Sequence, residues 1–106
     1  MKAYEILSSP KKWTKGAHFK DEKNETTYDR EHVTCMCLEG AVMLALDISP
    51  GVLYSSSQYQ RIESTILRRY GTERMKSGSY NVVASFNDHP GTTFEEVVAL
   101  LKELDL

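Results

Sequence analysis

Apolar residues recur at helical spacing along three segments of the chain, and the longest segment covers residues 31–46. Val33, Cys37 and Ala41 lie on one face of this segment, and further apolar side chains extend the apolar surface around most of the helix. We therefore predict a central helix here, surrounded by the rest of the fold. Gly40 lies in its interior, where glycine costs about 1 kcal/mol relative to alanine, so this position indicates a close approach by another backbone.

Two further segments carry an apolar stripe on one side. Residues 56–70 predict an amphipathic helix, and Gly71 follows as the residue expected just after the helix end. The last segment begins with TTFEE at residues 92–96, in which a threonine precedes a glutamate by three positions. This spacing is typical of a capping box, in which the two side chains bond to backbone N–H groups. The sequence thus predicts a C-terminal helix whose apolar stripe faces the core.

Shorter patterns predict the remaining elements. Residues 2–7 fit one or two helical turns, and residues 16–28 fit a small hairpin with GAHFK and ETTY as its arms. The run YNVVASF at residues 80–86 is typical of a short strand. NDHPG at residues 87–91 ends that strand with residues that favour a sharp turn. The expected fold class is α+β, with three main helices, a small N-terminal hairpin and a short strand before the C-terminal helix.

The size and composition of the chain indicate one folded domain, residues 1–106. An apolar share of 41% and a charged share of 26% are ordinary for a folded protein. No apolar run approaches the roughly 20 residues of a transmembrane helix, and the N-terminal stretch lacks the apolar core of a secretion signal. A net charge of −2 argues against an extended nucleic-acid interface. We expect a cytoplasmic protein with no membrane partner.

The two cysteines, Cys35 and Cys37, are separated by one residue. On a helix their side chains point roughly opposite ways, so a disulfide between them is not expected. The chain contains no CxxC, HxxxH or HExxH motif, and we expect no metal site and no cofactor. Cys37 as a nucleophile, with His18 or His89 as its base, would define a small hydrolase. This hypothesis is the least favoured one, because burial in an apolar segment raises a thiol's pKa and makes it inert.

Three stretches of the sequence together resemble a known family. They are WTKGA at residues 13–17, CLEGA at residues 37–41 and FNDHPGTTFEEVVALL at residues 86–101. In this order they are similar to the motifs of an uncharacterised family of small bacterial and phage proteins. The resemblance covers most of the chain, and it implies a bacterial or phage origin but no activity. The sequence departs from the family pattern at residues 20–30 and 72–79, so the resemblance does not support a site built from those loops.

Several polar and aromatic residues have the chemistry of a binding site for a nucleotide-like ligand. Aromatic rings stack on bases, Asn and Asp bond ring edges or ribose hydroxyls, and Arg binds phosphate. We hypothesise a non-catalytic protein of phage or mobile-element origin that sequesters or senses such a ligand, for example an immune-signalling nucleotide. The candidate ligand-binding residues are Trp13, His18, Tyr28, Arg68, Asn87, Asp88 and His89.

Other interpretations of the same residues stay open. Trp13 is more typical of a packing anchor than of a ligand contact, and the Asn87–Asp88 pair is more typical of a structural turn. Arg61 and Arg68 share a helix face that fits either a small anion site or a solvated flank. A different class of function is protein interaction, in which the protein inhibits or adapts a host protein, or pairs with itself as a homo-oligomer.

Overall fold

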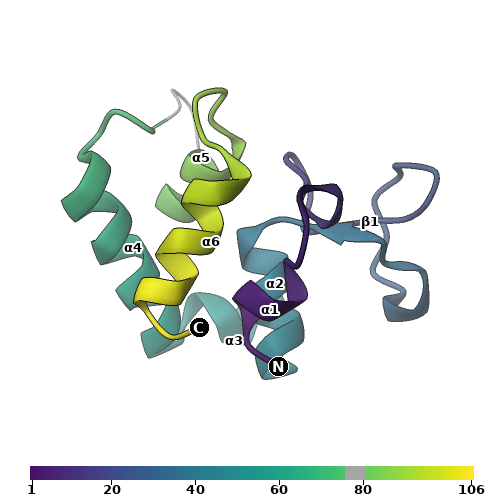
Figure 1. The fold of residues 1–106 in the computed structure, drawn as a ribbon. Coiled ribbons are helices and arrows are strands. Elements are labelled where there is room, and N and C mark those ends of the chain that lie inside the picture. The colour runs from purple at the N-terminus through teal and green to yellow at the C-terminus, as the bar shows by residue number, and fades with distance from the viewer. Residues whose placement is uncertain (76–80) are drawn as a thin grey trace.

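The computed structural model describes residues 1–75 and 81–106 and shows an α+β fold dominated by helices (Figure 1). Its elements in chain order are α1 (Ala3–Ile6), η1 (Pro10–Lys12), β1 (Phe19–Lys20), η2 (Arg30–His32), β2 (Cys35–Met36), α2 (Leu38–Leu46), α3 (Pro50–Tyr54), α4 (Ser57–Tyr70), α5 (Val82–Asp88) and α6 (Phe94–Glu103). Within the described residues, no helix has the length and apolar character needed to cross a membrane.

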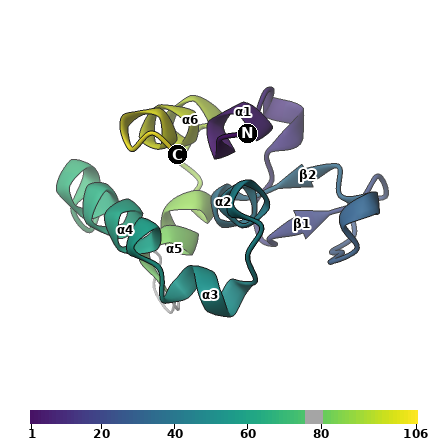
Figure 2. The ribbon, with the colours of Figure 1, turned by 90° about the horizontal axis from the view of Figure 1, so that it is seen from below.

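Helix α2 lies at the centre of the molecule, as its apolar sequence predicts. Figure 2 shows α2 end-on, with α1 and α6 above it, the two strands on one side, and α5 and α4 on the other side. Helix α2 contacts α1, α3, α5 and β2, while α6 packs against α1 and α4. The first six residues of α2 are all buried, and the apolar side chains among them belong to a core that also includes Phe86, Ile62 and Leu100.

The central helix begins at Leu38, and the prediction that it starts near residue 31 is wrong. Residues 30–32 form a short 3₁₀ turn instead, and Cys35–Met36 is a strand. Cys37 then caps α2, because its Sγ accepts a hydrogen bond from the Gly40 N–H at 3.3 Å. The apolar spacing continued through the strand and the cap, and so it did not mark where the helix began.

The small sheet also differs from the predicted hairpin. β1 pairs antiparallel with β2, with Phe19 opposite Met36 and Lys20 opposite Cys35. The 25–28 arm of the predicted hairpin contributes a single bridge between Lys20 and Thr26. A chain reversal does occur between these residues, but a more distant segment supplies the partner strand.

The predicted strand before the C-terminal helix is a helix, α5. Residue 80 of that predicted strand lies outside the described residues, and residues 82–88 are helical. Asn81 caps this helix by accepting a hydrogen bond from the Ala84 N–H at 2.6 Å. Val83 and Phe86 are three positions apart and both fully buried, which is the spacing of one helix face. A short apolar run fits both the two-residue repeat of a strand and the 3.6-residue repeat of a helix. Here the Asn81 cap and the burial of Val83 and Phe86 favour the helix.

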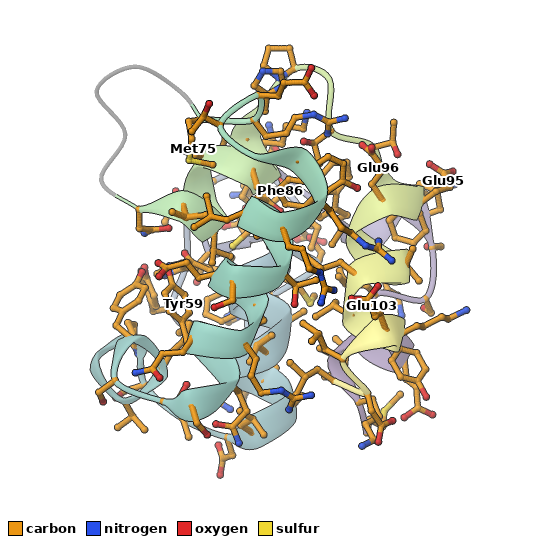
Figure 3. The ribbon with its side chains drawn as sticks, turned by 90° about the vertical axis from the view of Figure 1, so that its left-hand side faces the viewer. Tyr59, Met75, Phe86, Glu95, Glu96 and Glu103 are labelled. Atoms are coloured by element: carbon orange, nitrogen blue, oxygen red, sulfur yellow. The ribbon has the colours of Figure 1, made fainter. Side chains whose placement is uncertain are left out.

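The predictions for the other two helices are confirmed. Helix α4 ends before Gly71, whose φ of 58° lies in the left-handed region. Helix α6 begins with the predicted capping box: Glu96 N–H donates to Thr93 Oγ1 at 3.2 Å, and Thr93 N–H donates to Glu96 Oε1 at 3.0 Å. Figure 3 shows Glu96 and Glu103 on the side of α6 that faces α4.

The close backbone approach predicted at Gly40 is present. A Cβ atom at this position would overlap the carbonyl oxygen of His18 and crowd Met36 and Phe19. The same carbonyl of His18 accepts a hydrogen bond from Cys37 N–H at 3.0 Å. The absence of a side chain at Gly40 therefore lets the segment before β1 lie directly on the first turn of α2, and this places His18 at the candidate site.

Candidate functional site

A cavity of about 220 Å³ lies where the segment before β1, the start of α2 and helix α5 meet. Four of the sequence-predicted site residues, His18, Tyr28, Asn87 and Asp88, line it, whereas Trp13, Arg68 and His89 do not. The complete set of lining residues is Gly16, Ala17, His18, Thr26, Tyr28, Cys37, Glu39, Ala84, Asn87 and Asp88.

His18 joins two walls of this cavity. Its Nδ1 lies 2.9 Å from the Tyr28 hydroxyl, and its Nε2 lies 3.2 Å from Glu39 Oε1. A carboxylate only accepts hydrogen bonds, so Nε2 carries the proton in this contact, and in the neutral ring Nδ1 then accepts from the Tyr28 hydroxyl. The bonds fix the plane of the imidazole ring and align Tyr28, His18 and Glu39 in one row.

Glu39 is a buried carboxylate of this site that was not among the sequence-predicted residues. The residue is 2% exposed, and the Tyr59 hydroxyl donates to its Oε2 at 2.8 Å. The Tyr54 hydroxyl donates to Oε1 at 3.4 Å. Burial is the main cause that raises the pKa of Tyr59, and the hydrogen bond to Glu39 is the next. This phenol therefore keeps its proton and acts as a donor. Glu39 is the single charged residue between Val33 and Leu46, and this isolated charge was the available signal.

Asn87 makes four internal hydrogen bonds that hold the cavity wall together. Its Oδ1 accepts from Trp13 Nε1 at 2.7 Å and from Leu38 N–H at 3.0 Å. Its Nδ2 donates to the Thr14 carbonyl at 3.1 Å and to Asp88 Oδ1 at 2.9 Å. The side chain is 1% exposed with its bonding capacity in use, and so Asn87 positions its neighbours.

Asp88 presents a carboxylate at the edge of the cavity. Its Oδ1 accepts from Gly16 N–H at 2.9 Å in addition to the bond from Asn87. Gly16 has a φ of 84°, a backbone conformation that glycine adopts readily. Asp88 itself is half-buried. Two bonds to one oxygen hold the carboxylate in place while part of the side chain stays accessible to solvent.

The three remaining predicted site residues make contacts elsewhere. The Trp13 ring packs near Phe94, with centroids 6.4 Å apart, in addition to its bond to Asn87. His89 Nδ1 accepts from Gly91 N–H at 2.9 Å. Arg68 pairs with Glu103 at 2.7 Å, on the α4–α6 side of the molecule. The structure therefore does not bring these residues into the cavity with His18.

Cys37 lines the cavity as a protonated thiol. The pKa of this thiol is raised to about 12, mainly by burial and in part by the nearby charges of Glu39 and Asp88. A thiol with this pKa is a poor nucleophile near neutral pH. Both Cys37 and the half-buried Cys35 are free. In the part of the chain that the structure describes, no group of three or more His, Cys, Asp or Glu residues could hold a metal ion.

Together, the fold and the site define a small helix-dominated α+β protein with a polar, partly buried cavity. The chain belongs to a family of unknown function (DUF6197), whose model matches residues 1–104. This match confirms the expected membership of an uncharacterised family. No curated protein and no solved structure matches the chain.

Proposed function

We propose that this protein is a small, non-catalytic binding protein that holds a small polar ligand in the cavity between His18 and Asp88. The observation that carries the proposal is the convergence of an imidazole, a phenol and two carboxylates on one cavity of about 220 Å³. Three of these groups, on His18, Tyr28 and Glu39, are joined by hydrogen bonds. A concave site with a few polar groups held in fixed orientations is typical of small-molecule recognition.

The cavity volume limits the size of the ligand. Pockets for drug-sized ligands measure about 300–1,000 Å³, and this cavity is smaller. A single ring system fits such a space better than a complete nucleotide. Among the described residues, no lysine or arginine lines the cavity, so a phosphate group would have to remain outside. Our proposal for a nucleotide-like ligand is accordingly that its base, or a related nitrogen heterocycle, enters the cavity.

We further propose that the protein is cytoplasmic and of phage or mobile-element origin. Its role would be to sequester or sense an immune-signalling nucleotide. The proposed recognition of the base uses the ring of Tyr28 as a stacking surface. His18 and Asp88 offer polar atoms to the ring edge. A ligand held in this way would leave its sugar and phosphate groups accessible for other contacts.

Catalysis by Cys37 is less favoured than binding. The thiol accepts a hydrogen bond from Gly40 N–H and serves as the cap of α2. His18, the basic side chain of this cavity, is held by Tyr28 and Glu39. A cysteine hydrolase needs its base within hydrogen-bonding reach of the sulfur and a thiolate at working pH. The raised pKa of Cys37 opposes the second requirement.

A second candidate function is protein interaction, as an inhibitor or adaptor of a host protein or as a homo-oligomer. The observation that favours it is the exposure of large apolar side chains on and beside α3. Val52 is 52% exposed, Tyr54 is 41% exposed and Leu46 is 37% exposed. Exposed apolar surface of this kind is used in protein contacts when it is contiguous.

Native mass spectrometry after incubation with a bacterial small-molecule extract tests the binding function. We expect the protein to retain a small molecule that is released on denaturation. Ala17→Leu should abolish retention, because Ala17 lines the cavity and a larger side chain would fill it. Ala99→Leu, on the exposed face of α6, is the matched control and should retain the ligand. Equal retention by Ala17→Leu, or retention by none of the folded proteins, would contradict the proposal.

A further inference from the structure

The charges around the cavity are strongly one-sided. Glu39 and Asp88 contribute two carboxylates to its lining, and no lysine or arginine joins them among the described residues. Lys15, which lies close by in sequence, donates to the carbonyl oxygens of His89 and Thr92 at 2.6 and 3.2 Å. His18 directs its Nε2 at Glu39 at 3.2 Å, whereas the Asp88 carboxylate accepts hydrogen bonds from two neutral groups, the Gly16 N–H and the Asn87 amide.

Glu39 affects ligand binding through its negative charge and not through direct contact with the ligand. Its oxygens already accept bonds from the Tyr59 and Tyr54 hydroxyls and from His18. Hydroxyl donors stabilise a buried carboxylate without neutralising its charge. In a poorly solvated setting this charge is weakly screened, and it favours positive charge in the adjoining space.

Asp88 and Tyr28 offer the direct contacts. The described hydrogen bonds of Asp88 fall on Oδ1, and the half-buried carboxylate lies at the cavity edge where a ligand can reach it. Tyr28 lines the same cavity and is 61% exposed. A cation gains from a carboxylate through charge-assisted hydrogen bonds and from an aromatic face through its quadrupole.

We infer that the cavity selects a planar organic nitrogen cation, such as an amidinium or a protonated amino-heterocycle, over neutral or anionic molecules of the same shape. This inference rests on the proposed binding function and specifies its ligand class. Asp88 Oδ1 already accepts two hydrogen bonds, so a planar cation would donate one charge-assisted N–H bond to Oδ2. Tyr28 and His18, which line the cavity, also place aromatic side chains beside such a cation.

Three isosteric probes test the inference: benzamidinium, benzamide and benzoate, which carry a positive, a zero and a negative charge. Binding of each probe is measured by isothermal titration calorimetry at low and moderate salt. We expect benzamidinium to bind at least about tenfold more tightly than benzamide, since one charge-assisted hydrogen bond is worth that factor. Benzoate should bind most weakly, and added salt should weaken the binding of benzamidinium.

Two variants test whether the preference for benzamidinium arises in the cavity. Asp88→Asn keeps an oxygen that can accept from Gly16 N–H while it removes the charge, so it should weaken benzamidinium binding about tenfold. Asp105→Asn removes an exposed carboxylate beside Lys2 and should leave binding unchanged. Thermal melts of both variants establish that they are folded.

The outcomes separate the two proposals. Comparable binding of benzamide, or tighter binding of benzoate, would overturn the charge selection and leave a cavity that binds small molecules. Equal benzamidinium affinity in Asp88→Asn would overturn the role of this carboxylate and with it the inference. Failure of all three probes overturns the inference, and failure of the cell extract to supply any retained molecule overturns the proposed function separately.

Discussion

The Trp13 indole N–H lies 2.7 Å from Asn87 Oδ1, and this hydrogen bond ties the N-terminal segment to the end of α5. Asn87 extends the connection to α2 through the Leu38 N–H. Three chain segments that are distant in sequence therefore meet at one buried amide. The cavity lies beside this junction, so its shape depends on the junction staying intact.

Replacing Asn87 should destabilise the fold strongly. Asn87→Ala leaves the Trp13 and Leu38 donors without their acceptor, and each unpaired buried polar group costs about 1–3 kcal/mol. We expect a loss of about 2–4 kcal/mol in the free energy of unfolding, measured by urea titration. Trp13→Tyr removes one of these bonds and should cost less. A stability of Asn87→Ala equal to that of the parent would refute the role of the junction.

Gly40→Ala should destabilise the protein through a backbone clash. The added methyl group would overlap the His18 carbonyl oxygen, and overpacking of this kind costs about 1–3 kcal/mol. Gly51→Ala is the matched control, because Gly51 is in α3 and has open space around its Cβ position. The control should be neutral or more stable by about 0.5–1 kcal/mol, since alanine favours the helix. Chemical unfolding of the two variants side by side checks the difference.

Alkylation should distinguish the two cysteines. Cys37 is buried with a thiol pKa of about 12, whereas Cys35 is half-buried. At pH 8 we expect iodoacetamide to modify Cys35 first, and to modify Cys37 only as fast as the protein unfolds. Mass spectrometry of peptides at successive times measures both rates. Rapid modification of Cys37 in the folded protein would reopen the hydrolase hypothesis.

Glu96 should make stability depend on acidic pH. Its hydrogen bonds to Arg74, at 2.9 and 3.0 Å, are the main cause that lowers the pKa of this carboxyl. The stabilisation is thus present above the pKa of the unfolded chain and is lost as the pH falls through the lower folded-state pKa. Glu96→Gln retains the capping side chain, and it should cost about 1 kcal/mol at pH 7 and less at pH 2.

Urea titrations of Glu96→Gln at pH 7 and pH 2 measure this change. Glu95→Gln is the control, because Glu95 is exposed and Figure 3 shows it on the side of α6 away from α4. Its stability should follow that of the parent protein at both pH values. A cost of Glu96→Gln that is the same at pH 2 as at pH 7 would contradict the assigned role of the ion pair.

Local signals explain which elements the sequence predicted correctly. The TTFEE pattern carries both halves of a capping box, and its start at Thr93 is confirmed. Gly40 was informative because a glycine inside an apolar helix needs a packing reason, and the His18 backbone supplies it. In both cases a few neighbouring residues contain the physical cause.

The wrong predictions concern elements whose structure depends on residues far away in the sequence. Five residues, VVASF, satisfy strand and helix periods alike, so burial of Val83 and Phe86 decided the outcome for α5. The pairing of Phe19 with Met36 is between segments separated by a long loop. Glu39 offered an isolated charge in the sequence, but its partners Tyr59 and His18 come from other elements. The cavity could therefore be anticipated in part, from His18, Tyr28, Asn87 and Asp88.

Mapping the bound state by nuclear magnetic resonance tests the central claim most directly. Backbone amide shifts of the ¹⁵N-labelled protein are followed during titration with nucleobases and benzamidinium. We predict saturable shifts concentrated at Gly16, His18, Tyr28 and Asp88, and their loss in Ala17→Leu. Shifts concentrated instead on α3, or the absence of saturable shifts in the folded protein, would contradict a ligand-binding cavity at this site.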